Sequence, residues 1–202
     1  MPDIITLTDP RSPVSEAYRS LRANLAFARP DEPLEVAANL AVVSAQADQR
    51  VILVDADLRR PAQHERFGLE NTRGLTDALV ADLPGGPPLQ PTAVPGLFIL
   101  TSGPLPPNPA ELLASRRMRA LLTDLAARAD LVIIDAPPLV AVSDAAVLAQ
   151  QVDGVLLVLA AGRSRRDHAV QAKETLAKVG ATLLGVVLTE VEPDSAAYGA
   201  YR

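Results

Sequence analysis

The chain has 202 residues, 49% of them hydrophobic but only 3% aromatic, which predicts one domain with a core of Ala, Val and Leu side chains. Its formal net charge is -5, and its densest basic cluster, residues 163–166, is followed at once by Asp167, so we expect no nucleic-acid partner. It has no Cys for disulfides or thiolate metal sites, no leader-peptide pattern, and no apolar stretch near the ~18 residues of a membrane span. We therefore expect a globular, cytoplasmic protein.

Helix and strand patterns alternate along the chain. A first helix is predicted to start at Ser12-Pro13, a cap followed by proline at the first helical position, and to run toward residue 27. Five later runs are aliphatic at nearly every position, which is typical of strands covered on both faces: residues 51–54, 97–100, 131–134, 155–159 and 183–188. Further helices are predicted at residues 36–49, 109–129, 143–151 and 165–179. This alternation predicts an α/β fold, a mostly parallel sheet with helices on both faces.

Carboxylates follow two of the predicted strands. Asp55 and Asp57 come directly after the first aliphatic run, and Asp135 comes after the third. Ligands of parallel sheets bind beyond the carboxyl ends of the strands, and Mg²⁺ combines a few carboxylate ligands with bound waters. We therefore predict that these aspartates hold Mg²⁺, largely through water, and serve phosphoryl transfer. The alternative is that they only cap the turns that follow the strands.

The sequence around these aspartates resembles one protein family. Residues 55–59, Asp-Ala-Asp-Leu-Arg, are similar to the second nucleotide motif of the bacterial capsule and exopolysaccharide tyrosine kinases, and residues 133–137, Ile-Ile-Asp-Ala-Pro, are similar to their Walker B motif. The resemblance extends over nearly the whole chain, from about residue 12 to about residue 191. It implies a P-loop NTPase fold of the MinD type, ATP and Mg²⁺ as cofactors with Arg59 and Arg60 beside the nucleotide, and activity as a protein-tyrosine autokinase.

Both ends of the chain carry further features of this family. Glu16, Arg19 and Arg22 match its E-x-x-R-x-x-R self-association helix, and their i,i+3 spacing places them on one helical face. The resemblance implies ring-type self-association through the region 1–34, with a solvated charged face as the alternative. It also implies phosphorylation of Tyr198 and Tyr201 in a flexible tail at residues 192–202, with a flexible terminus that merely contains tyrosine as the alternative.

The resemblance also implies partners and a location. Members of the family regulate polysaccharide synthesis and export together with a membrane chain-length modulator, or co-polymerase. We therefore expect such a membrane partner, which would recruit this single cytoplasmic domain of residues 1–202 to the inner face of the membrane.

The loop that holds ATP phosphates in this family is missing from the sequence. A P-loop reads G-x-x-x-x-G-K-[ST], and its backbone amides and Lys surround the phosphates. The one glycine pair with that separation, Gly180 and Gly185, is followed by two Val residues, and both lysines of the chain, Lys173 and Lys178, come late. We therefore predict weak or absent ATP binding and impaired or absent kinase activity.

The position of the missing segment can be located. In the family a central strand and the P-loop would separate segments like residues 30–34 and 36–41, but only Glu35 stands between them here. The sequence therefore predicts a sheet without its central strand, in which the neighbouring strands close up or another segment fills the position. We consider residues 4–8, Ile-Ile-Thr-Leu-Thr, as that segment.

Several interpretations of the whole chain stay open. It is a tyrosine kinase by descent that is inactive in this form, or a non-catalytic binding and oligomerisation module of the same polysaccharide system. A MinD- or ParA-type ATPase is the alternative within the wider fold. An engineered internal deletion or an error in the gene model would give the same sequence, and intact aspartates beside an abrupt join favour a recent loss.

Overall fold

The structure, a computed structural model, describes residues 4–9, 12, 14–15, 18–19 and 33–191. Glu16, Arg22, Tyr198 and Tyr201 lie outside the described residues, so their roles in self-association and phosphorylation stay predictions. Arg19 is described as a half-buried residue in helical conformation.

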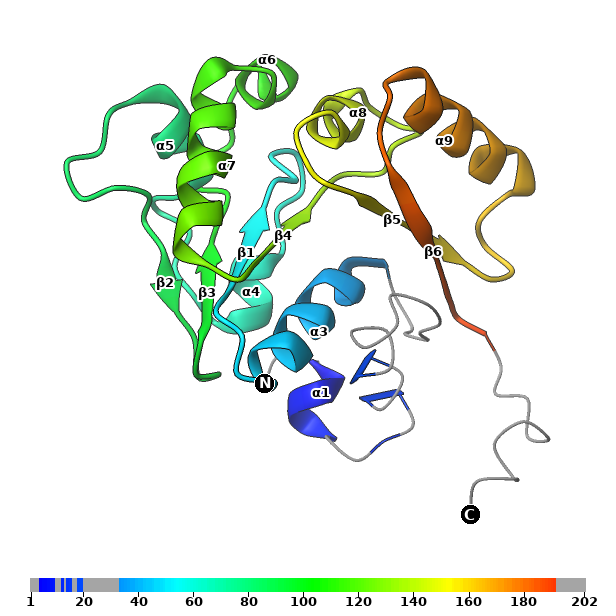
Figure 1. Cartoon of the computed structure of the whole chain (residues 1–202), viewed down its shortest axis with the longest axis horizontal. Helices are drawn as coiled ribbons and strands as arrows, with labels where there is room; N and C mark the ends of the chain where they lie inside the picture. Colours follow the sequence, from blue (N-terminus) through cyan, green and yellow to red (C-terminus); the bar gives the residue numbers. More distant parts are fainter. Residues whose placement is uncertain (1–3, 10–11, 13, 16–17, 20–32, 192–202) are drawn as a thin grey trace.

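Helices and strands alternate along the described chain (Figure 1). The strands are β1 (Val51–Asp55), β2 (Gln90–Pro91), β3 (Leu97–Leu100), β4 (Leu131–Asp135), β5 (Val155–Ala160) and β6 (Leu183–Thr189). The helices are α1 (Ile5–Thr8), α3 (Pro33–Ala45), α4 (Gln63–Phe67), α5 (Leu75–Val80), α6 (Pro109–Leu113), α7 (Arg116–Arg128), α8 (Asp144–Ala149) and α9 (Arg166–Lys178). All five strands predicted from the aliphatic runs are confirmed, and the α/β fold class is confirmed with them.

The prediction of one continuous helix at residues 109–129 was wrong. The pattern at residues 109–129 predicted a single helix, but the structure has two, α6 and α7. Between them Ser115 is extended (φ -68°, ψ 158°), and its Oγ accepts a hydrogen bond from the Met118 N–H at 3.1 Å. This is a local N-cap, which satisfies a free amide at the start of α7 and therefore begins a new helix.

The strands form two sheets instead of one. The first has the order β2-β3-β1-β4, in which β3, β1 and β4 are parallel and β2 is antiparallel to β3. The second is the parallel pair β5-β6. Within the part of the chain that the structure describes, no strand pairs with the free edge of β4 or of β5, and these two strands are neighbours in Figure 1. The sheet is thus divided at the position where the sequence predicted a missing strand.

Residues 4–8 do not fill that position, so this interpretation was wrong. Ile5–Thr8 forms the short helix α1, and Thr6 is tied to α3, because its N–H and hydroxyl both donate to Asn39 Oδ1, at 3.2 and 3.0 Å. A residue pair 33 positions apart, which no local pattern reveals, therefore decides the conformation of this segment.

The core lies on both faces of β1. Ile52 and Val54 belong to a cluster with the apolar side chains of α5 and α7, while Val51 and Leu53 belong to a cluster with those of α3. Since side chains of a strand alternate between faces, helices on both sides leave all four of these residues at most 2% exposed. The predicted cover of the sheet by helices on both faces is confirmed for β1.

No helix in the described ranges is both long enough and apolar enough to cross a membrane.

Candidate functional site

Two predicted site residues meet at the carboxyl ends of adjacent strands. β1 and β4 run parallel in register, so that Asp55 and Asp135 are direct partners across the two strands. The next residue, Ala56, donates its N–H to the Asp135 backbone carbonyl at 2.8 Å, which extends the pairing past the strand ends. Both carboxyl groups are buried, with Asp55 fully inaccessible and Asp135 7% exposed.

Asp55 is held by the backbone that returns past it. Its Oδ2 accepts hydrogen bonds from the N–H groups of Ala62 and Gln63, at 3.0 and 2.9 Å. Its Oδ1 is buried and has no hydrogen-bond partner among the described residues. Burial raises the pKa of Asp55 to about 6, and the charge of Asp57 adds to this shift, although hydrogen bonds from the backbone of Gln63, Ala62 and Asp57 oppose it. Asp55 therefore presents one buried, unpartnered oxygen at the end of β1.

Asp135 is linked to Asp55 through one residue, Gln63. The Gln63 side-chain amide donates from Nε2 to Asp135 Oδ2 at 2.6 Å, while the Gln63 backbone N–H binds Asp55. Burial raises the pKa of Asp135 to about 7; the Gln63 hydrogen bond and the positive charge of Arg66 lower it, and the charge of Asp55 raises it. A pair of buried carboxyls with raised pKa values favours a bound proton or a cation.

Asp57 has a different environment at the start of the following turn. Its Oδ1 accepts the backbone N–H groups of Arg59 and Arg60, at 3.0 and 2.9 Å. This is the turn-capping role that the sequence left open as an alternative, because an Asp side chain can bind the backbone two and three residues later. Asp57 is 6% exposed and lies close enough to Asp55 and Asp135 for its charge to raise both of their pKa values.

The structure pairs Arg59 with a protein carboxylate. Its Nε and Nη2 donate to the two oxygens of Asp144, at 2.8 and 3.1 Å, in a bidentate ion pair. The Asp144 side chain is fully buried, and the Arg59 side chain is 43% exposed. Arg60 is exposed. The predicted contact of both arginines with a nucleotide stays a prediction, and for Arg59 it competes with this ion pair.

Sequence reasoning missed three side chains of the site: Gln63, Arg66 and Asp144. Gln63 and Arg66 lie on α4, a helix of five residues that is too short for a periodic pattern. Asp144 stands at the start of α8, 85 positions from Arg59. Asp144 lies within the helix predicted at residues 143–151, but nothing in the sequence indicated an arginine partner.

The aspartates suit a hydrated Mg²⁺ better than a directly bound ion. In the described ranges there is no group of three or more His, Cys, Asp or Glu side chains placed to hold a metal ion directly. The unpartnered Oδ1 of Asp55 and the raised pKa of Asp135 show uncompensated negative charge that a nearby cation would stabilise. Bound there, Mg²⁺ would supply positive charge against the phosphates of a nucleotide.

Unlike Mg²⁺, the triphosphate of ATP does not fit the residues present in this chain. The sequence has no glycine-rich loop with a following Lys, and Lys173 and Lys178 are both exposed on α9. α3, the helix whose start is nearest in sequence to the expected loop, begins at Pro33, which has no N–H to donate. The chain therefore lacks the glycine-rich loop and the Lys that would hold the phosphates during phosphoryl transfer.

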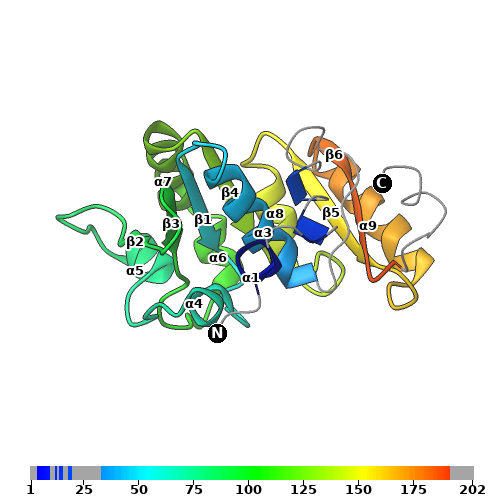
Figure 2. The same cartoon turned by 90° about the horizontal axis from the view of Figure 1, so that it is seen from below.

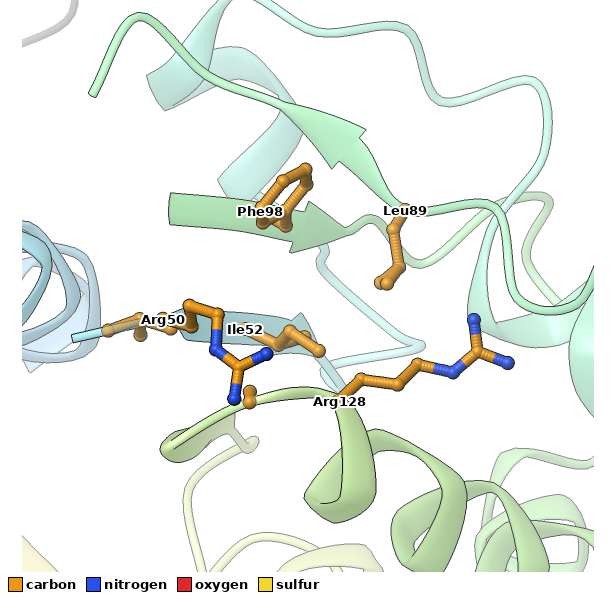
Figure 3. A pocket seen from close by; sticks show the side chains of 7 residues that line it. Arg50, Ile52, Leu89, Phe98 and Arg128 are labelled. Atoms are coloured by element: carbon orange, nitrogen blue, oxygen red, sulfur yellow. The ribbon is translucent and has the colours of Figure 1, made fainter. Parts of the chain in front are cut away.

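A hollow of about 240 Å³ lies at the other end of β1 (Figure 3). Phe98 and Leu89 face Arg50, Ile52 and Arg128 across it. A five-residue strand is roughly 13 Å long, so this hollow is well separated from the carboxylates. Its two arginines form ion pairs with neighbouring aspartates, at 3.4 and 2.9 Å, and no catalytic group lines it. It is not part of the aspartate site.

Comparison with known proteins finds bacterial tyrosine kinases. No family model matches the chain. Tyrosine-protein kinase YwqD of Bacillus subtilis (strain 168) is 42% identical over 201 residues, covering 92% of this chain and 85% of that protein. The solved kinase domain of the Escherichia coli tyrosine kinase ETK superposes with a TM-score of 0.86 at 34% identity, covering 95% of this chain and 81% of that one.

A more distant structure shows the wider fold. The septum site-determining protein MinD from Pyrococcus horikoshii OT3, solved in complex with Mg-ADP, has a TM-score of 0.61 at 21% identity and covers 81% of this chain and 69% of that one. At this identity the likeness shows the fold alone, which is the P-loop NTPase fold of the MinD type predicted from the sequence.

Proposed function

The chain belongs to the family of bacterial tyrosine-protein kinases, and we propose that it is a kinase-type domain of a capsular or exopolysaccharide system that does not transfer phosphate from ATP. One observation carries this proposal: the buried carboxylates Asp55 and Asp135 are in register at the strand ends, but the sequence has no P-loop to hold phosphates opposite them. Phosphoryl transfer depends on positioning and charge neutralisation of the phosphates, and carboxylates alone supply neither.

The first experiment measures ATP-Mg²⁺ binding by equilibrium titration, together with tyrosine phosphorylation of the purified chain. We expect a dissociation constant above about 1 mM and no phosphotyrosine. A matched variant carries an aliphatic strand and a G-x-x-x-x-G-K-S loop between Glu35 and Val36, and its control carries the same insertion with Ala in place of the loop Lys. We expect the Lys variant to bind ATP at least about tenfold more tightly than the control. Micromolar binding of ATP by the unmodified chain, or phosphotyrosine on it, contradicts the proposal.

The remaining activity of such a domain is binding. We propose that the segment carrying Glu16, Arg19 and Arg22 still supports self-association, and that the domain works in the cytoplasm beside a membrane co-polymerase. In that setting Tyr198 and Tyr201 would be phosphorylated by an active copy of a related kinase rather than by this chain. Light scattering of the chain and of its Arg19→Glu variant tests self-association, and equal masses at equal concentration contradict this role for Arg19.

A further inference from the structure

The hollow at the start of β1 is apolar and is bordered by an exposed aromatic ring. Its lining includes Ile52, Leu89 and Phe98 around a volume of about 240 Å³ (Figure 3). Phe98 is 38% exposed, whereas the other three residues of β3 are at most 1% exposed. A concave apolar surface with a few polar groups at its border is typical of small-molecule sites, and covering an exposed ring releases the water around it. The hollow therefore favours a small apolar ligand.

The hollow has room for two aromatic rings and a flat wall to hold them. It lies between the sheet and the end of α7, and in the view from below β1, β3 and α7 lie next to one another (Figure 2). An apolar cavity of about 150 Å³ holds benzene, so the larger volume here suffices for a two-ring compound. Ile52 and Phe98 are register partners on adjacent strands, so their side chains point to the same face of the sheet and form one wall. A flat ligand makes the most contact with that wall.

The two arginines that border the hollow differ in how fully their charges are compensated. Arg128 forms a bidentate pair with Asp124, in which Nε and Nη2 donate at 3.0 and 2.9 Å. The Arg50 side chain, by contrast, is 65% exposed and reaches Asp130 only through Nη2, at 3.4 Å. Its Nε and Nη1 have no hydrogen-bond partner among the described residues, while its backbone is fixed by hydrogen bonds to Asp130, at 2.8 Å from the N–H and 2.8 Å at the carbonyl. Arg50 therefore offers charged donors to an anionic group beside the hollow.

From the apolar hollow, its exposed ring and the incompletely paired guanidinium at its border, we infer that this hollow binds a small aromatic monocarboxylic acid. The rings of the ligand lie against Phe98 and Ile52, and its carboxylate accepts hydrogen bonds from Arg50. The ligand carries one negative charge and not several, because the carboxylates of Asp124 and Asp130 lie beside the two guanidinium groups and would repel a second.

The test uses the whole chain without nucleotide and two compounds of nearly equal shape, 2-naphthoate and the neutral 2-naphthalenemethanol. Binding is measured by amide chemical shifts in two-dimensional NMR spectra, which also locate the site. We expect 2-naphthoate to shift the amides of residues 50–52, 97–99 and 128–129, with a dissociation constant at or below about 1 mM. The alcohol keeps the rings but offers no charge to Arg50, so we expect it to bind at least about fivefold more weakly.

Three variants separate the contributions of charge and ring. Arg50→Gln should bring the affinities for the acid and the alcohol to within about twofold of each other, because it removes the charge that distinguishes them. Arg119→Gln is the matched control: Arg119 is exposed on the same helix as Arg128 but about 13 Å along it, so the preference for the acid should persist. Phe98→Leu removes the ring and should weaken binding of both compounds at least about threefold. Circular dichroism verifies that each variant is folded, and the two compounds compared on the unsubstituted chain decide the question if a variant is not.

Three results would overturn the inference: no amide shifts at about 5 mM 2-naphthoate, shifts confined to residues outside the hollow, or equal affinity of the unsubstituted chain for the acid and the alcohol. The inference does not depend on the proposed function, since the hollow contains no residue of the aspartate site. Failure of 2-naphthoate to bind leaves the absence of kinase activity untouched, and tight ATP binding by the chain would refute the proposed function without affecting the hollow.

Discussion

Replacing Asp135 with Asn should stabilise the protein at neutral pH. The substitution keeps the shape of the side chain and an oxygen that can accept the Gln63 Nε2 hydrogen bond, now 2.6 Å long. It removes a negative charge from a buried position, where burial raises the pKa of Asp135 from 3.8 to about 7. A shift of roughly three units corresponds to about 4 kcal/mol. This is an upper limit, because part of the shift is repulsion shared with Asp55.

The sign of the pH dependence follows from linkage. The folded-state pKa of Asp135 lies above its unfolded value, so its contribution to stability is complete below pH about 4 and is lost as the pH rises through about 7. Asn does not titrate, and therefore Asp135→Asn should match the unsubstituted chain near pH 4 and exceed it by about 1–4 kcal/mol at pH 8. Urea unfolding followed by circular dichroism, at pH values of about 4.5, 6 and 8, measures the difference.

Asp144→Asn is the matched control, since Asp144 is also a buried aspartate at the site but already has a cation beside it. Removing its charge breaks the bidentate pair with Arg59, at 2.8 and 3.1 Å. Because Arg59 is 43% exposed, we expect a loss of only about 1–2 kcal/mol at pH 8, opposite in sign to the effect at Asp135. If Asp135→Asn is destabilising at pH 8, or stabilises equally at pH 4.5, the buried environment inferred for Asp135, in which desolvation outweighs the charge of Arg66, is refuted.

Three further substitutions, one of them with a matched control, test individual contacts. Gln63→Ala removes the side-chain amide that donates to Asp135 and should lower the free energy of unfolding by about 1–3 kcal/mol in urea titrations; no loss would contradict this hydrogen bond. Gly74→Ala places a methyl group against the backbone of residues 101–103 and should lower the thermal midpoint by several degrees, whereas Gly85→Ala, whose added methyl meets nothing, should leave it unchanged. Ser115→Ala removes the cap of α7 and should cost about 1 kcal/mol, and an unchanged urea midpoint would argue against the cap.

The parts of the fold that the sequence predicted are those that depend on local pattern. A strand covered on both faces must be aliphatic at every position, and residues 51–54 and 131–134 are. Two such strands in a parallel sheet place their carboxyl ends at one edge, and so Asp55 and Asp135 were expected to meet before the register was known. Strand composition and parallel order were sufficient for that inference.

The parts that the sequence did not predict depend on contacts between distant residues. The bridge from Gln63 to Asp135 spans 72 positions and the pair of Arg59 with Asp144 spans 85. α4 and α5 have five and six residues, fewer than the two turns over which a helical period becomes visible. Their positions are fixed by tertiary contacts, which a single sequence does not contain.

The two acidic environments of the site show why its charges stay unbalanced in this chain. Asp144 and Asp135 are both buried, but the protein supplies Asp144 with a guanidinium within hydrogen-bond distance, whereas Asp135 has the Gln63 amide and a smaller contribution from the charge of Arg66. A fixed cation satisfies a structural carboxylate permanently. A carboxylate without one retains an unfavourable charge at neutral pH, which a proton or an exchangeable cation can remove. Asp55 and Asp135 therefore have the electrostatics of a cation site even though the chain offers no cradle for the phosphates that would share that cation.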